Sequence, residues 1–135
     1  MANALYVNYK NLFLGGGVGA ARPDMDSNDI KCVLTDHGGD TPVVATDQDL
    51  ADISAGTIDT SPNMAGAAIA GGAIDYDNFT FTAVAGVQSE SLNWYNDSVG
   101  DILILYMDTA TGLPVTPNGG DINVLLNVAG LYGFI

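Results

Sequence analysis

The stretch DILILYMDTATGLPVTPNGGDINVLLN, residues 101–127, combines the strongest strand signal of the chain with its densest turn chemistry. Every residue between Asp101 and Asp108 is apolar, so a strand there should be covered on both faces and lie inside a sheet. Burial of each of its six side chains contributes roughly 1.5–3 kcal/mol before conformational entropy is subtracted. We therefore expect this strand to be the centre of the core.

The segment that follows this strand is rich in turn-forming residues. Residues 109–120 contain Gly112, Pro114 and the dipeptide Asn118-Gly119, the strongest short signal for a β-hairpin. Residues 121–126 would then return as the next strand. The sequence predicts that this turn joins two neighbouring strands.

Three further segments alternate apolar and polar residues, as half-buried strands do: residues 29–36, 79–85 and 89–95. Residues 96–100 should form the hairpin turn into the central strand. Trp94 shares strand parity with Leu92, so we expect it inside the domain. Residues 128–135 are apolar enough to form a closing strand. The predicted fold is all-β, a single-domain antiparallel sandwich or barrel of six to eight strands.

The N-terminal residues differ from this pattern. Apolar residues at helical spacing precede three consecutive glycines, which indicates a short amphipathic helix or an arm that docks on a partner. We therefore divide the chain into an N-terminal arm with a glycine joint, residues 1–20, and a β-rich domain, residues 21–135. The candidate partner-binding residues of this arm are Leu5, Tyr9, Leu12 and Phe13.

A second short helix is expected at residues 46–53. Thr46 resembles a cap, and Asp49 places an acid in the first turn, where the helix dipole favours it. Residues 54–74 are rich in Gly and Ala and should form a long loop or a weak edge strand. Met64 and Ile69 in this segment are the other candidate contact residues.

Composition excludes several classes of function. The 135-residue chain carries 3 Lys and Arg against 16 Asp and Glu, a net charge of −13, which argues against binding a nucleic-acid backbone. Its single cysteine, Cys32, cannot form an internal disulfide and is expected as a buried strand thiol. No signal peptide or stretch able to span a bilayer is evident, so we expect a soluble protein made in a cytoplasm, without a membrane partner.

Residues with chemical potential are few and scattered. His37 is the single histidine, which excludes a multi-histidine metal site, and we interpret it as a loop residue. Residues 24–28 imitate the first half of a calcium loop, but Asp29 occupies the glycine position, so a turn is the preferred interpretation. Asp75 and Asp77 could form a carboxylate pair, but a solvated turn is favoured. We predict no catalytic residues, no metal ligands and no cofactor.

Four segments resemble a family of small proteins encoded in tailed bacteriophages and prophages: MANALY at 1–6, DIKCVLTD at 29–36, FTFTAV at 79–84 and DTATGLPVTPNGGDINV at 108–124. The last run is long and specific. The chain departs from the family at its ends, where NYKNLFLGGGVGA stands in place of a charged helix and LLNVAGLYGFI in place of a tryptophan-containing strand.

The resemblance implies a virion structural protein, most plausibly a capsid decoration or cement protein. Such a protein would bind the outer surface of the major capsid protein lattice, associate with itself as a homotrimer, and pass through the host cytoplasm during assembly. The alternative is a tail- or fibre-associated binding module that would use exposed aromatics such as Tyr76, Trp94 or Tyr95. A metal-assisted hydrolase that uses Asp pairs is a weaker third possibility.

Overall fold

The computed structural model describes residues 3–17, 24–126 and 131–133. Its main element is an antiparallel sheet of five strands in the order β1-β8-β7-β2-β3. Its strands are β1 (Ala4–Leu5), β2 (Ile30–Thr35), β3 (Thr57–Thr60), β7 (Ser91–Asn96) and β8 (Ile102–Met107). The expected all-β domain is confirmed.

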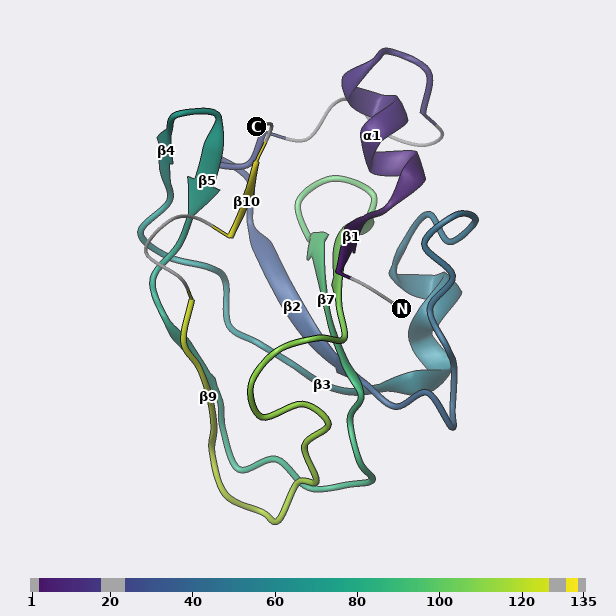
Figure 1. The fold of residues 1–135 in the computed structure, drawn as a ribbon, viewed down its shortest axis with the longest axis vertical. Coiled ribbons are helices and arrows are strands. Elements are labelled where there is room, and N and C mark those ends of the chain that lie inside the picture. The colour runs from purple at the N-terminus through teal and green to yellow at the C-terminus, as the bar shows by residue number, and fades with distance from the viewer. Residues whose placement is uncertain (1–2, 18–23, 127–130, 134–135) are drawn as a thin grey trace.

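Two small sheets and two short helices accompany the main sheet. One small sheet has the order β10-β5-β4, and the other pairs β6 with β9. Their bounds are β4 (Ala68–Ala70), β5 (Ala73–Asp75), β6 (Phe79–Phe81), β9 (Ile122–Val124) and β10 (Tyr132–Gly133), and the helices are α1 (Val7–Phe13) and the 3-10 helix η1 (Leu50–Gly56). In Figure 1 the small sheets lie on one side of the main sheet, and the helices lie on the other.

The central strand is buried as expected. In β8 the residues from Ile102 to Tyr106 are at most 5 % exposed, because β7 pairs along one edge and both faces are covered. Trp94 of β7 is fully buried and meets Phe79 of β6 edge-on, with 6.3 Å between the ring centroids. The prediction that Trp94 lies inside the domain is confirmed, as is the turn at residues 96–100 that joins β7 to β8.

The two faces of the main sheet differ in chemistry. One face carries a row of apolar residues in register across three strands, Leu34, Leu92 and Met107. The opposite face carries Asn93, which is paired in register with Val33 and Tyr106 and is fully buried. Strands β2 and β7 were expected to be half-buried, but their polar face is also covered, because N-terminal residues pack on it.

The N-terminal segment is part of the core and is not a detached arm. Tyr6 is 0 % exposed, Tyr9 is 1 % exposed and Leu12 is 8 % exposed. The backbone is tied to the main sheet, since Ala4 pairs with Tyr106 and the Tyr6 amide donates to the carbonyl oxygen of Ile104 at 3.0 Å. The division into an arm at residues 1–20 and a separate domain is therefore wrong for the described residues of this segment.

The second helix begins later than predicted. It is a 3-10 helix over Leu50–Gly56, and its N-cap is Asp49 rather than Thr46. Asp49 accepts a hydrogen bond from the Ala51 amide, and the Asp52 side chain accepts from the Asp49 amide, which is a reciprocal capping box. Asp49 and Asp52 therefore cap a helix that begins about one turn after the start predicted at Thr46.

Residues 54–74 form more structure than a long loop. Thr57–Thr60 is the edge strand β3, and residues 68–75 form the hairpin of β4 and β5. Of the expected closing strand, Tyr132–Gly133 forms β10 against β5, while residues 128–130 and 134–135 lie outside the described part of the chain.

The predicted hairpin at Asn118-Gly119 is wrong. Strand β9 pairs with β6, with Asn123 opposite Thr80, and it does not pair with β8. The turn itself does form, since Gly119 has a φ of +87° and the Gly120 amide donates to Asn118 Oδ1 at 3.0 Å. The strand predicted at residues 79–85 ends at Phe81, and Ala83 has a φ of +52°.

Candidate binding groove

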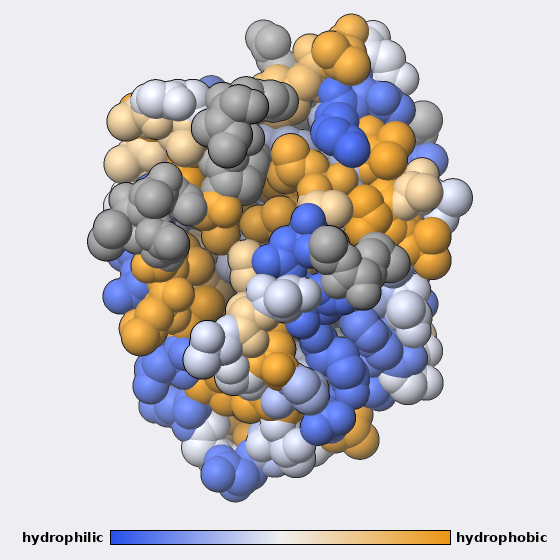
Figure 2. Space-filling view, in the orientation of Figure 1, coloured by the Kyte–Doolittle hydropathy of each residue, from blue (hydrophilic) through white to orange (hydrophobic). Residues whose placement is uncertain are grey.

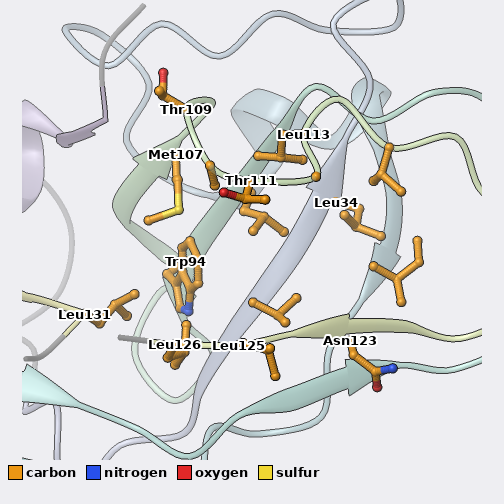
Figure 3. A pocket seen from close by; sticks show the side chains of 16 residues that line it. Leu34, Trp94, Met107, Thr109, Thr111, Leu113, Asn123, Leu125, Leu126 and Leu131 are labelled. Atoms are coloured by element: carbon orange, nitrogen blue, oxygen red, sulfur yellow. The ribbon is translucent and has the colours of Figure 1, made fainter. Parts of the chain in front are cut away.

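An apolar groove of about 670 Å³ opens between the main sheet and strand β9. Figure 3 shows its side chains converging from three directions. We call it the β9 groove and define it by its three sides: the main-sheet residues Leu34, Leu92, Trp94 and Met107, residues 109–113 with Val115, and residues 122–126 with Leu131. Its volume is within the usual range of a ligand site.

The floor of the β9 groove is the apolar face of the main sheet. Leu34, Leu92 and Met107 lie in register on adjacent strands, so they form a continuous row. Leu34 is fully buried beneath the groove, whereas Met107 is half-buried at its side. The sheet register therefore fixes the floor.

Strand β9 presents its edge to the groove. Successive residues of a strand point to opposite faces, yet Ile122, Asn123 and Val124 all line the groove. This is possible when the groove runs along the edge of the strand. In Figure 3 the strand that carries Asn123 runs beside the cavity, with β6 on its far side.

The walls hold an unusual concentration of incompletely buried apolar side chains. Leu125 is 78 % exposed, and the half-buried apolar residues of the walls are Leu113, Val115, Ile122, Val124, Leu126 and Leu131. Figure 2 shows hydrophobic residues at the left edge of the molecule, near the upper end of β9, whereas hydrophilic residues dominate the lower right. An exposed apolar patch with polar surroundings is typical of an interaction site.

None of the described residues that line the groove is charged, but acidic residues are next to two of them in the sequence. Asp108 immediately precedes Thr109, and Asp121 immediately precedes Ile122, both of which line the groove. Asp121 Oδ1 accepts a hydrogen bond from the Ala83 amide at 2.9 Å. The groove is therefore apolar inside a strongly acidic domain.

Trp94 has an unsatisfied side-chain donor in the part of the chain that the structure describes. Among the described residues, its Nε1 is the buried side-chain nitrogen or oxygen without a hydrogen-bond partner. In Figure 3 this nitrogen is directed toward Leu126, at one end of the β9 groove. Leaving such a buried donor unpaired costs about 1–3 kcal/mol.

The candidate residues chosen from the sequence lie elsewhere. Tyr9 and Leu12 are buried in the core, while Leu5, Phe13 and Met64 are partly buried against it. Ile69, on β4, is 62 % exposed and remains available to a partner. None of these six lines the β9 groove; Tyr9 and Phe13 contact each other, with 4.9 Å between their ring centroids.

Sequence reasoning missed the groove because its walls come from segments that pair non-locally. One signal was available: Leu125 and Leu126 are consecutive apolar residues after β9, a pattern that indicates apolar surroundings on both faces of the chain. The pairing of β9 with β6, which places these residues beside the main sheet, is not encoded in any local pattern.

The aromatics proposed for a tail-associated module are not exposed. Tyr76 is 5 %, Trp94 is 0 % and Tyr95 is 3 % exposed. The Tyr76 hydroxyl donates to the Met25 carbonyl oxygen at 2.6 Å. Burial and neighbouring acids raise the pKa of Tyr95 to about 12. These side chains serve the core and do not form an exposed aromatic site.

A buried polar network lies on the other face of the main sheet. Tyr6 donates to Asn93 Oδ1 at 2.6 Å, and Asn93 Nδ2 donates to Thr35 Oγ1 at 2.9 Å and to Ser91 Oγ at 3.2 Å. His37 Nε2 lies 2.9 Å from the same Ser91 oxygen. Ser91 is 0 % exposed, so this Ser-His contact is closed to a substrate and stabilises the sheet.

The acidic residues are used in turns. The Asn28 amide donates to the Asp24 carbonyl oxygen at 2.9 Å, as the turn interpretation of residues 24–28 requires. A hydrogen bond from Ser27 lowers the pKa of Asp24, and the hydrogen bond with Asp24 raises the pKa of Asp26. Asp75 Oδ1 accepts from the Tyr76 amide at 2.9 Å.

Within the described ranges, no group of three or more His, Cys, Asp or Glu side chains could hold a metal ion. None of the helices described is long and apolar enough to cross a membrane. Cys32 is a fully buried free thiol, and this burial raises its pKa.

No protein-family model matches the sequence, and a search of curated proteins finds no significant relative.

Proposed function

We propose that this protein is a capsid decoration protein of a tailed bacteriophage, which binds the outer surface of the major capsid protein lattice and stabilises the head. The observation that carries the proposal is the β9 groove, an apolar surface on a small acidic β-domain. Such a surface suits binding to a protein, because it offers contact area without catalytic side chains. The resemblance of residues 29–36, 79–84 and 108–124 to phage proteins is the reason for proposing the major capsid protein as the partner.

The charge of the chain supports a place on the outside of the shell. With a net charge of −13, the domain is repelled by packaged DNA and competes for none of its counterions. An acidic surface also keeps unbound copies apart in the host cytoplasm before assembly. We propose that copies associate as homotrimers on the lattice, where contacts with the shell offset this repulsion.

The tail- or fibre-associated module is the competing proposal, and it would use the same groove. The two differ in the number of copies per particle. Quantitative mass spectrometry of purified virions that contain the protein should find hundreds of copies for a shell protein, whereas a handful would indicate the tail.

The direct test uses shells assembled from major capsid protein alone. The purified protein should co-sediment with these shells and raise the temperature at which they open. A sample with no shells is the control for self-sedimentation. If the protein binds no such lattice at any concentration where it stays soluble, the decoration proposal is wrong.

A further inference from the structure

Strand β9 has a partner on one edge only. In the described part of the chain it forms a two-stranded ribbon with β6, and its other edge runs along the β9 groove. An unpaired edge presents backbone donors and acceptors at a regular spacing, which is a template for another strand. The groove therefore offers hydrogen bonds along one side and apolar surface along its floor.

The dimensions of this site suit an extended segment. Residues 122–126 line one side, and the three that form strand β9, Ile122–Val124, extend roughly 10 Å at about 3.3 Å per residue. Alternate side chains of a strand placed there would face the row that contains Leu34 and Met107. Strand addition of this kind gives affinity through the backbone and specificity through alternate pockets.

Charge selects the kind of segment. The described lining residues are uncharged, Asp108 and Asp121 adjoin them in the sequence, and the chain carries a net charge of −13. An occupant with apolar residues in the middle and Lys or Arg at its ends would match both features. A second copy of this chain would bring another −13 to the contact, so it is a poorer match.

The orphan donor of Trp94 lies at the end of the same groove. Its indole nitrogen is directed toward Leu126, with no partner among the described residues. A peptide carbonyl oxygen that replaces the Leu126 side chain at this point would accept its hydrogen bond. A wholly apolar occupant would leave the donor unsatisfied.

We infer that the β9 groove binds an extended peptide segment, apolar in its centre and flanked by Lys or Arg, which adds as a strand to the free edge of β9. The assignment of this segment to the capsid subunit rests on the proposed function. The inference that the groove binds such a strand does not depend on the proposed function.

The test uses the whole protein labelled with ¹⁵N. Trp94 is the single tryptophan, so its indole N–H gives one signal that reports on the groove. The probes are peptides of about nine residues with Lys-Lys at both ends and Val, Ile, Leu or Phe alternating with Thr between them. Matched probes carry Glu-Glu ends, or N-methyl groups on alternate amides that remove strand hydrogen bonds.

At least one lysine-flanked peptide should bind with a Kd below about 1 mM and shift the Trp94 indole signal together with the amides of residues 122–126. The glutamate-flanked and N-methylated forms should bind at least about tenfold more weakly. Equal binding of either form overturns the inference. So does failure of every lysine-flanked peptide to bind.

Two surface variants separate the groove from other apolar sites. Leu125→Asp should weaken peptide binding by about tenfold or more, because it removes an exposed apolar side chain from the wall and introduces a charge that a bound peptide would have to desolvate. Ile69→Asp is the matched control, since Ile69 is comparably exposed on β4, and it should change binding by less than about twofold. If both variants bind like the parent protein, the groove is not the site.

The other possible occupants are outcomes of the same experiment. If a neutral apolar dye such as Nile red binds the groove and no peptide displaces it, the groove is a small-molecule site and the inference is wrong. The inference is also wrong if Leu125→Asp abolishes self-association while no peptide binds, because a second copy then occupies the groove. If the peptides bind but capsid shells do not, the strand-addition site stands and the decoration proposal falls.

Discussion

Removal of residues 1–14 should unfold the domain, because this segment contributes to the core. Tyr6, Tyr9 and Leu12 are almost completely buried, and each such side chain contributes roughly 1.5–3 kcal/mol. The deletion would also leave the buried Asn93 Oδ1 without the Tyr6 hydroxyl, at a cost of about 1–3 kcal/mol. The expected loss, roughly 5–12 kcal/mol, is comparable with the whole stability of a domain of this size.

Two single substitutions on α1 and its C-terminal end give a graded version of this experiment. Leu12→Ala should lower the free energy of unfolding by about 2–4 kcal/mol, because Leu12 is 8 % exposed. Leu14→Ala should change it by less than about 0.5 kcal/mol, because Leu14 is 86 % exposed. Both remove the same atoms, so the difference between them measures burial.

Urea denaturation followed by Trp94 fluorescence and by far-ultraviolet circular dichroism provides the measurement. The deleted protein should show no cooperative transition, and Leu12→Ala should shift the midpoint to lower urea without changing the slope. If the deleted protein keeps the parent spectrum and midpoint, or if Leu12→Ala and Leu14→Ala unfold together, the N-terminal segment is an arm after all and the reasoning from burial fails.

Three further predictions concern charge and the buried thiol. Burial, and to a smaller extent the charges of Asp97 and Asp49, raise the pKa of Asp101 above 3.8. Protonated Asp101 therefore favours folding at acid pH, and this contribution is lost as the pH rises through the folded-state pKa. Asp101→Asn should stabilise the protein more at pH 7 than at pH 3 in paired thermal melts, and an equal gain at both pH values would refute this prediction. Cys32 should react with Ellman's reagent only after urea unfolds the chain, and rapid labelling of the folded protein would contradict its burial. Because the net charge is −13, the melting temperature should rise between low and moderate salt, whereas a flat response would indicate that the acids are already compensated.

Patterns that depend on neighbouring residues predicted the fold well. The unbroken apolar run gave the central strand β8, strand parity placed Trp94 inside, and residues 96–100 gave the turn that joins β7 to β8. These features depend on burial of both faces or on local turn geometry, both of which the sequence records directly.

Features that depend on distant contacts were not predictable in the same way. Asn93 alternates with apolar residues, as an exposed residue of a half-buried strand would, yet it is fully buried. Tyr6, 87 positions away in the chain, covers it and donates to its side chain. A polar residue can therefore occupy a covered sheet face when a distant partner satisfies its hydrogen bonds, and no local pattern identifies that partner.

The wrong hairpin prediction and the existence of the groove have one common cause. For β9 to pair with β8, β8 would need a free edge, but β7 occupies one edge and Ala4–Leu5 of β1 occupies part of the other. The turn at Asn118-Gly119 is bonded instead to Val84, with the Gly119 amide 2.7 Å from its carbonyl oxygen, which holds β9 beside β6. Displaced in this way, β9 keeps one edge unpaired and faces the apolar row of the main sheet across a gap. Strand β1, which belongs to the segment predicted to be an arm, thus helps to create the β9 groove, because it occupies part of the β8 edge that β9 would need.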